Sequence, residues 1–588
     1  MKYKLILYLS KTGKIILDEL PFVIIFFCCI VPTTVKDFLM NAPSGANFKY
    51  FSLAFFYTFV LALLGHRNKY LKALFYAIGV FLFATYMFLW LVFGTCISPL
   101  IIQLIAETNV RESSEFINAF ILNKGSLITY GASAILIIAI IFLEKIWQKI
   151  KTKNVFQSLY TTVAVSFFSI LFTLTGIYNL KIFYALAKCQ FMDELEVWVQ
   201  ENIPFPMDSF TAITYSMYAP HATMNEINMA VNFAKDIYNQ TISDEMNDSI
   251  NIIYILGESY IKSHASLYGY KLKTTPFMDT EQKKGNLIAF NNVVAPFNST
   301  TLVEKNTFCC NSIADGEAWY KTPYFPILFK KAGYKVSFWD IQRDFAKNAF
   351  FTFSVNSFIY NKELMKYAYS HTSDKSFMYD EELVDDFFLN KASKLDKKNL
   401  IMFHFMGQHI GASDRYPHTQ QFTKFSYKDI KRNEPYMTKE KKQDIADYDN
   451  ATLYNDYIIS KIAKHYTNKP TVMIYFSDHG EEIYDYRDSK GRNAGSNGVT
   501  PELVKYQYEI PFIIWFSTPF MKKYPKLVDE INKTKDKPFV TDNVCQVLFH
   551  LTGLKTKWYK ADRDLFSPQY RSKKRIIAGV DYDNFVTH

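Results

Sequence analysis

Asn251-Ile-Ile-Tyr-Ile-Leu-Gly-Glu-Ser259 joins an uninterrupted apolar run to a carboxylate and a hydroxyl. Short apolar runs of this kind are typical of strands buried inside a parallel sheet. Two later clusters, His404-Phe-Met-Gly-Gln-His409 and Ser477-Asp-His-Gly-Glu-Glu482, also follow strand-like runs. Because parallel strands end at one edge of a sheet, we expect the polar groups of all three clusters to meet there. Carboxylates and imidazoles converging at one edge indicate a metal-centred hydrolase or transferase site.

The chain from residue 248 onward alternates strand-like runs with segments long enough for helices. This alternation predicts a mostly parallel sheet with helices on both faces. The runs are Asn251–Leu256, Leu287–Val294, Lys335–Trp339, Asn399–Phe405, Thr471–Phe476 and Pro511–Phe516. A helical pattern over Lys439–Lys464 contains Asp449, Asn450 and Asp456, which we expect to hydrogen-bond neighbouring elements rather than a ligand.

The first 180 residues have a different character, with long apolar stretches separated by short basic loops. Each stretch is near the roughly 20 residues that cross a bilayer, so we predict five membrane helices, at 18–36, 49–65, 70–94, 126–147 and 157–180. Lysines precede the first, third and fifth helices, which the positive-inside rule makes the cytoplasmic side. Everything after the fifth helix is therefore predicted to face the periplasm or cell exterior. A helical bundle buried in protein is the alternative.

These patterns divide the chain into a transmembrane domain, 1–180, an amphipathic connector at the membrane surface, 181–245, and an outer catalytic domain, 246–588. The net charge of +10 is distributed without an arginine–aromatic stripe, which argues against nucleic acid and favours partners with anionic head groups. The seven cysteines are too few and too unevenly placed for a disulfide framework. The outer domain must therefore depend on its own hydrophobic core.

Several longer motifs resemble those of bacterial phosphoethanolamine transferases. They are Gly257-Glu-Ser-Tyr-Ile-Lys-Ser-His-Ala-Ser-Leu-Tyr-Gly-Tyr270, Phe403-His-Phe-Met-Gly-Gln-His409, Tyr448-Asp-Asn-Ala-Thr-Leu-Tyr-Asn-Asp456, Ser477-Asp-His-Gly-Glu-Glu482 and Tyr508-Glu-Ile-Pro511. The resemblance covers essentially the whole chain. It implies a five-helix transmembrane bundle followed by an α/β domain of alkaline-phosphatase/sulfatase-like fold, in a multi-pass protein of the bacterial inner membrane with its catalytic domain in the periplasm.

The same resemblance implies an activity. Members of the family take phosphoethanolamine from phosphatidylethanolamine through a covalent phospho-threonine at a zinc site, and pass it to a cell-envelope saccharide such as lipopolysaccharide core or lipid A. The cysteine-poor outer domain is more like the core-modifying members, and we expect a monomer surrounded by membrane lipids. The alternatives are phosphoglycerol transfer, hydrolysis of phosphate or sulfate esters by a related membrane enzyme, and a non-catalytic scaffold.

The metal ligands implied by the resemblance are Glu258, Thr300, Asp478 and His479. Carboxylate oxygens with one imidazole suit zinc, with manganese as the alternative, and the presence of a second metal stays open. Thr300 matches the family nucleophile, and Thr301 is its rival. A threonine hydroxyl is a poor nucleophile at neutral pH, so a nearby metal is needed to activate it.

Candidate residues for the substrate are less closely defined. His409 matches a family histidine that contacts the phosphoryl group and assists the leaving oxygen. Gln342 and His404 are candidates for the substrate pocket, and packing on the strand is the alternative for His404.

One departure from the family pattern concerns a histidine that usually follows the Asp-His-Gly motif. The segment Asp488–Asn497 contains no histidine. We expect Lys490 or Arg492 to replace it as a cation facing phosphate, because both side chains donate hydrogen bonds to anionic oxygen.

Overall fold

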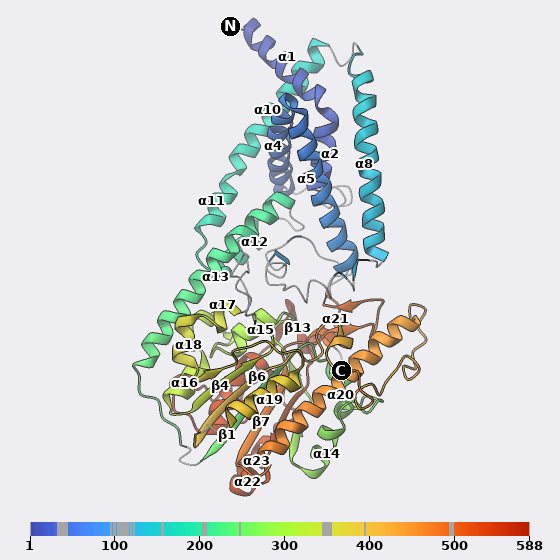
Figure 1. The fold of residues 1–588 in the computed structure, drawn as a ribbon. Coiled ribbons are helices and arrows are strands. Elements are labelled where there is room, and N and C mark those ends of the chain that lie inside the picture. Colours follow the sequence, from blue (N-terminus) through green and yellow to red (C-terminus); the bar gives the residue numbers. More distant parts are fainter. Residues whose placement is uncertain are drawn as a thin grey trace. The chain divides into compact units, whose positions relative to one another are not determined.

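The computed structural model describes residues 2–31, 45–93, 97, 101–102, 117, 120–121, 124–153, 158–202, 208–245, 249–343, 356–392, 396–492 and 499–586. It contains two compact units, residues 1–226 and 227–588 (Figure 1). The boundary falls inside the segment predicted as a connector.

The described part of unit 1 is helical. Its elements are α1 (Lys2–Asp18), α2 (Leu20–Ile30), α4 (Gly45–Arg67), α5 (Lys69–Phe88), a π-helical turn (Leu89–Phe93), α8 (Lys124–Ile150), α10 (Leu159–Asn179), α11 (Lys181–Lys188) and α12 (Met192–Asn202). A longer helix, α13 (Ser209–Tyr238), continues into unit 2 and contains Pro220. The predicted connector is therefore helical over most of its described residues.

Three helical segments of unit 1 are long and apolar enough to cross a membrane: Lys69–Phe93, Lys124–Ile150 and Leu159–Lys188. They match the predicted third, fourth and fifth spans. The first two predicted spans correspond to shorter apolar helices, Leu20–Ile30 and Phe51–Arg67. Residues 32–36 of the first predicted span lie outside the described residues. The structure thus confirms a helical membrane region, in which three helices of the described residues, rather than five, meet the length that a bilayer requires.

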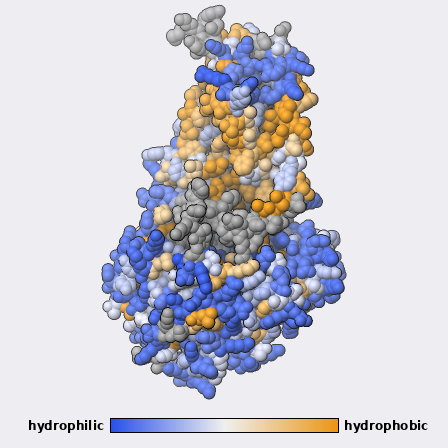
Figure 2. All heavy atoms as spheres, in the orientation of Figure 1, coloured by the Kyte–Doolittle hydropathy of each residue, from blue (hydrophilic) through white to orange (hydrophobic). Residues whose placement is uncertain are grey.

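Hydrophobic side chains cover the visible outer faces of the unit 1 helices (Figure 2). On α8, for example, Ile135, Ile138 and Phe142 are 69%, 66% and 61% exposed. Apolar surface of this extent is costly in water but favourable against lipid. The outward-facing residues therefore argue for a membrane environment and against a bundle buried in protein.

Unit 2 is built on a seven-stranded sheet with the order β2-β10-β7-β1-β6-β4-β5. β10 is antiparallel to both of its neighbours, whereas β7, β1, β6, β4 and β5 are parallel. The strands are β1 (Ile250–Gly257), β2 (Leu287–Ala289), β4 (Lys335–Asp340), β5 (His371–Thr372), β6 (Lys398–His404), β7 (Thr471–Ser477) and β10 (Phe512–Phe516). The predicted strands are confirmed, except that Leu287–Val294 is split into β2 and a separate β3 (Val293–Val294).

Helices cover both faces of this sheet, as predicted. On one face Ile253 and Ile255 of β1 belong to a core cluster with residues of α19 (Asp380–Asn390) and α20 (Lys439–Tyr466). Tyr254 points to the other face, where its ring contacts Phe308 and Phe325 beside α15 (Thr300–Thr307) and α16 (Phe325–Lys331). With both faces covered, all eight residues of β1 are buried, which explains its uninterrupted apolar sequence.

The strand register brings the polar ends of three strands to one edge. Leu256 of β1 pairs with His404 of β6 and with Phe476 of β7, and Gly257 pairs with Ser477. Glu258 and Asp478 therefore each follow the last paired residue of adjacent parallel strands. This register places their carboxylates side by side.

The polar residues of α20 connect neighbouring elements, as predicted. Asp456 accepts hydrogen bonds from the backbone nitrogens of Phe277 and Met278, and Asn450 accepts from those of Lys424 and Phe425. These bonds hold the loops around the sheet edge to one long helix.

Buried His264 forms ion pairs with a carboxylate of α20 and with a carboxylate of a neighbouring loop. Its Nδ1 lies 2.8 Å from Asp449 Oδ1 and its Nε2 lies 3.0 Å from Asp485 Oδ1. Burial by itself lowers the pKa of His264, but the two carboxylates raise it to about 10. A charged imidazole therefore ties the loop after β1 to α20 and to the loop after β7.

We predict that His264→Asn destabilises the protein by about 3 kcal/mol, because it leaves buried carboxylates without their cation. An unfolded histidine titrates near pH 6.5, and the folded value is about 10. The stabilising interaction is therefore complete below about pH 6.5 and is lost as the pH rises towards 10. The difference in melting temperature between wild type and variant should shrink over this interval. A constant difference would contradict the charged pairing.

Candidate active site

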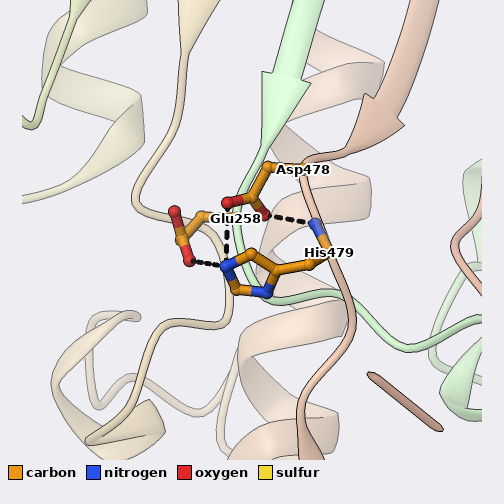
Figure 3. Close-up of side chains that lie close together, drawn as sticks. All are labelled: Glu258, Asp478 and His479. Atoms are coloured by element: carbon orange, nitrogen blue, oxygen red, sulfur yellow. Dashed lines mark hydrogen bonds and ion pairs between the residues drawn. The ribbon is translucent and has the colours of Figure 1, made fainter. Parts of the chain in front are cut away.

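Glu258, Asp478 and His479 meet at the carboxyl edge of the sheet, at the ends of β1 and β7 (Figure 3). All three side chains are fully buried. His479 Nε2 lies 2.9 Å from Asp478 Oδ2 and 3.3 Å from Glu258 Oε1. Ligand atoms of the three residues all lie within 4.8 Å of one another. The edge predicted from the strand ends is therefore a compact candidate metal centre.

The hydrogen bonds around the cluster leave its acceptors facing inward. His479 Nδ1 lies 3.0 Å from the carbonyl oxygen of Gly480, so Nδ1 carries the proton and Nε2 presents its lone pair. Asp478 Oδ1 accepts from the backbone nitrogens of Ser259 and His479, whereas Asp478 Oδ2 accepts no hydrogen bond. Burying such acceptors together is unfavourable unless a cation joins them. Two carboxylates and a neutral imidazole fit a divalent metal ion.

The electrostatics of the cluster agree with this fit. Burial, with the charge of Arg492, lowers the pKa of His479 to about 3, and burial raises the pKa of Asp478. A neutral imidazole is the form that binds metal. A cation would return the buried aspartate to its ionised form.

The Thr300 hydroxyl joins the same cluster. Thr300 is the first residue of α15, and its Oγ1 lies 3.1 Å from Glu258 Oε2 and 3.3 Å from His479 Nε2. Among the hydrogen bonds of the described residues, none joins Thr301 to these side chains. All four residues predicted as metal ligands are thus brought together, with Thr300 rather than Thr301 facing them.

Strained backbone supports the site. Ser259 has φ of +58°, in a left-handed region that non-glycine residues rarely occupy, and its hydroxyl donates to Glu258 Oε1 at 2.7 Å. Strain of this kind costs roughly 1–3 kcal/mol and persists where surrounding contacts require it. Here the conformation lets Ser259 hold Glu258 through its side chain and Asp478 through its backbone nitrogen.

Gln342 and His404 lie beside the cluster and hold Glu258. Gln342 Nε2 is 3.1 Å from Glu258 Oε2 and 3.2 Å from His404 Nε2. His404 is fully buried, and Asp340 and Glu304 overcome the effect of burial to raise its pKa to about 10. The charge of buried His404 acts on Glu258 through space, and Gln342 orients the Glu258 carboxylate by donating to it.

Two carboxylates of this network were missed by the sequence reasoning. Asp340 Oδ1 lies 3.0 Å and Glu304 Oε1 lies 3.3 Å from His404 Nδ1. Asp340 ends a strand-like run in the same way as Glu258, and Glu304 lies four residues after Thr300 on the same face of α15. Both positions are recognisable signals for a side chain at the same sheet edge.

His409 also lies in the electrostatic field of the site. Burial lowers the pKa of His409 to about 3. The charge of Glu258 raises this pKa, and the charges of Arg415 and Arg492 lower it. The Nδ1 of His409 is buried without a hydrogen bond. His409 is therefore neutral, and its Nδ1 is available for a substrate.

The structure distinguishes the two cations considered as replacements for the late histidine. Arg492 Nη1 donates to His479 Nε2 at 2.7 Å and to the carbonyl oxygen of Asn298 at 3.0 Å. Lys490 instead pairs with Asp444 Oδ2 of α20 at 2.8 Å. The geometry brings the guanidinium to the site and gives no support to the prediction that Lys490 binds substrate.

A protein-family model described as Sulfatase matches residues 250–554, from the start of β1 to just beyond α24 (Val544–Thr552). The match covers more than half of the chain and includes Glu258, Thr300, Asp478 and His479. The chain belongs to the sulfatase family.

Within the sulfatase family the chain is similar to named phosphoethanolamine transferases. EptC of Escherichia coli is 25% identical over 544 residues, which cover 88% of this chain and 87% of the relative. The solved C-terminal periplasmic domain of EptC from Escherichia coli is 26% identical, with a TM-score of 0.50, over 58% of this chain and 96% of that domain. These matches confirm the predicted resemblance and the prediction of an enzyme of this type.

A third similarity extends over both units. The integral membrane lipooligosaccharide phosphoethanolamine transferase A (EptA) of Neisseria meningitidis has a TM-score of 0.54 at 15% identity, over 96% of this chain and 98% of the other. At this identity the likeness concerns the fold alone. It confirms a sulfatase-type α/β domain combined with a helical membrane region.

We predict that Gly407→Ala weakens metal binding without removing a ligand. Gly407 has φ of +48°, and an added Cβ would lie 2.8 Å from the carbonyl oxygen and 3.0 Å from the nitrogen of Glu258. The main chain of Glu258 must move, which should lower metal affinity by about tenfold or more. Metal content after purification, and titration of the metal-free protein, measure this.

Gly333→Ala is the matched control. Gly333 also has a positive φ, +88°, but no atom lies within 4 Å of an added Cβ. Both variants carry the backbone strain of roughly 1–2 kcal/mol, and only Gly407→Ala should lose metal. Wild-type metal affinity in both would show that Glu258 is not a ligand or is not held by this contact.

Proposed function

We propose that this chain transfers phosphoethanolamine from phosphatidylethanolamine to a lipopolysaccharide acceptor, core or lipid A, through a phospho-threonine on Thr300 at a zinc site. The observation that carries the proposal is the position of Thr300 Oγ1, 3.1 Å from Glu258 and 3.3 Å from His479. A hydroxyl at the start of a helix and inside a candidate metal centre is the arrangement that phosphoryl transfer requires. The named activities of the relatives give the transferred group.

The chain supplies several features that favour a phosphoryl group at Thr300. The backbone N–H groups in the first turn of an α-helix lack helical partners, and the Ser299 side chain makes no capping hydrogen bond to α15. These groups and the helix dipole attract an anion. A divalent metal held by Glu258, Asp478 and His479 supplies positive charge that favours the ionised threonine oxygen.

Two displacements at phosphorus account for the transfer. In the first, Thr300 Oγ1 bonds to phosphorus, the bond to the diacylglycerol oxygen breaks, and that oxygen takes up the proton that Thr300 has lost. In the second, an acceptor oxygen bonds to phosphorus, the bond to Oγ1 breaks, and the acceptor's proton returns to Thr300. Each displacement inverts the phosphorus, so the configuration is retained overall.

His409 is assigned to the phosphoryl oxygens and the leaving oxygen. Its pKa of about 3 makes the ring neutral at physiological pH, and a neutral imidazole donates one hydrogen bond and accepts another. His409 can therefore donate to a phosphoryl oxygen without adding a charge that would repel the metal.

Zinc is the proposed metal because two carboxylates, one neutral imidazole and one hydroxyl make a compact mixed N/O set of four ligands. Manganese is the alternative. We propose that one metal suffices, since the Arg492 guanidinium brings a second positive charge to the cluster. Arg492 Nη1 lies 2.7 Å from His479 Nε2 and must give up this hydrogen bond when that nitrogen binds the metal, because the nitrogen has one lone pair.

The proposed setting is the bacterial inner membrane. α2 and the Phe51–Arg67 part of α4 would complete five spans with the three longer helices, placing unit 2 in the periplasm. A donor that is itself a membrane lipid requires a catalytic unit anchored in this way. We further propose that the chain acts as a monomer, with helices of residues 181–245 on the lipid surface and a core-type acceptor.

The experiment that tests the nucleophile is mass spectrometry of the purified protein after incubation with phosphatidylethanolamine and zinc. We predict a phosphoethanolamine adduct on Thr300, and its loss together with all transfer in Thr300→Ala, because the attacking atom is gone. Thr301→Ala is the matched control and should keep the adduct. An adduct on Thr301, a phosphoglycerol adduct from phosphatidylglycerol, or none in metal-loaded protein would each refute the assignment.

A second variant pair tests the guanidinium. We predict that Arg492→Ala lowers kcat/KM by roughly tenfold to a hundredfold, the value of a charged hydrogen bond to phosphate. Arg492→Lys should recover only part of the loss, because lysine has no planar fork. Lys490→Ala should stay near wild type, since Lys490 pairs with Asp444. Equal losses in Arg492→Ala and Lys490→Ala would contradict the assignment.

A further inference from the structure

A second concave site lies in unit 2, between the segment before α20 and the first turn of that helix. It is a pocket of about 430 Å³ whose lining includes four lysines, one aromatic ring and one amide: Lys428, Lys431, Lys439, Lys442, Tyr427 and Asn433. All of the residues 417–442 that surround it are described by the structure. None of the four predicted substrate residues lines this pocket.

The lysines of this pocket, which we call the basic pocket, have no acidic partners. Among the described residues, no carboxylate lies within ion-pair distance of any of the four ammonium groups. The acidic residues nearby have other partners: Asp429 accepts from Ser426, and Glu434 pairs with Arg432. Lys431 Nζ donates to the carbonyl oxygen of Lys428 at 2.7 Å, which orders it and leaves further N–H donors for a ligand.

The position of these charges opposes helix stability. Lys439 and Lys442 stand in the first turn of α20, a helix of 28 residues whose N-terminus is capped by Thr438. The N-terminus of a helix carries partial positive charge, so cations there cost stability, typically about 0.3–1 kcal/mol each. A bound anion would reverse this cost, because it is attracted by the lysines and by the helix dipole. Departures from local stability rules of this kind are expected at functional positions.

The basic pocket is braced to the loop that carries the candidate metal ligands. Arg432 Nη2 donates to the carbonyl oxygen of Asp485 at 3.0 Å, and Ile430 belongs to one apolar cluster with Ile483 and Tyr484. This loop follows directly from His479 at the end of β7. The basic pocket therefore belongs to the same rigid part of unit 2 as Thr300.

We propose that the basic pocket binds a phosphorylated sugar of the acceptor saccharide, and so selects anionic acceptors. This proposal rests on the proposed transferase function. The ammonium groups match phosphate oxygens and Asn433 offers an amide to a sugar ring, while the Tyr427 ring, 4.6 Å from Lys439 Nζ, holds one of the lysines in place. Anionic lipid head groups carry the same charge, but no large apolar side chain of residues 417–442 is exposed to enter a bilayer.

The test uses the full chain in detergent, with the four lysines changed together to glutamine: Lys428→Gln, Lys431→Gln, Lys439→Gln and Lys442→Gln. The matched control is Lys522→Gln with Lys526→Gln. These exposed lysines follow β10, whose antiparallel direction puts them at the opposite edge of the sheet. Two measurements separate the halves of the reaction: adduct formation on Thr300, which needs no acceptor, and transfer to a phosphorylated core saccharide.

We expect adduct formation to be unchanged in both variants. The KM for the phosphorylated acceptor should rise about tenfold in the basic-pocket variant only. Raising the ionic strength from about 0.05 to about 0.5 M should raise the wild-type KM and leave that of the variant almost constant. With an acceptor treated by phosphatase, wild type and variant should have the same KM.

An unchanged KM in the basic-pocket variant, or an equal loss with the dephosphorylated acceptor, would overturn the proposal. So would a variant effect in nanodiscs that follows the content of phosphatidylglycerol rather than the acceptor phosphates, since this would assign the pocket to lipid. Fluorescence anisotropy of a labelled phosphorylated core saccharide gives a readout without turnover. The wild type could form no adduct and yet bind the saccharide more tightly than the basic-pocket variant does. That result would refute the proposed function and support the proposal that the basic pocket binds the saccharide.

Discussion

Repulsion among buried hydrogen-bond acceptors governs the catalytic unit. Glu258, Asp478 and His479 present carboxylate oxygens and a lone pair within 4.8 Å of one another, with their side chains fully buried. Such a group persists only if the surrounding structure holds it firmly and a cation completes it. The parallel register of β1 and β7, the left-handed Ser259 and the close approach of Gly407 all contribute to this hold.

Three cationic side chains lie at increasing distances from this cluster. Arg492 reaches His479 directly, the charge of buried His404 acts on Glu258, and Gln342 donates to the same carboxylate. His264 lies further out and joins the loop after β1 to α20. Fixed cations inside a low-dielectric site stabilise developing negative charge without reorganising, which is how a rigid site favours a phosphoryl transition state.

α20 contributes residues both to the support of the sheet edge and to the basic pocket. Its buried face packs on the sheet and its polar residues hold the loops at the sheet edge, while its N-terminus carries Lys439 and Lys442 of the basic pocket. One rigid helix can therefore hold the proposed acceptor-binding surface in a constant relation to the loops at the sheet edge. Loops supported by such elements commonly carry specificity, because they vary without disturbing the core.

Local sequence patterns alone determined the strands, the apolar membrane region and the convergence of Glu258, Asp478 and His479. A buried strand needs an apolar run, a bilayer needs about 20 apolar residues, and parallel strands must end at one edge. Only the tertiary structure decided that Arg492 rather than Lys490 reaches the site, that Thr300 rather than Thr301 faces Glu258, and that Asp340 and Glu304 charge His404. These outcomes depend on the length and direction of side chains from segments far apart in the chain. The periodic pattern of apolar residues within one segment carries no information about them.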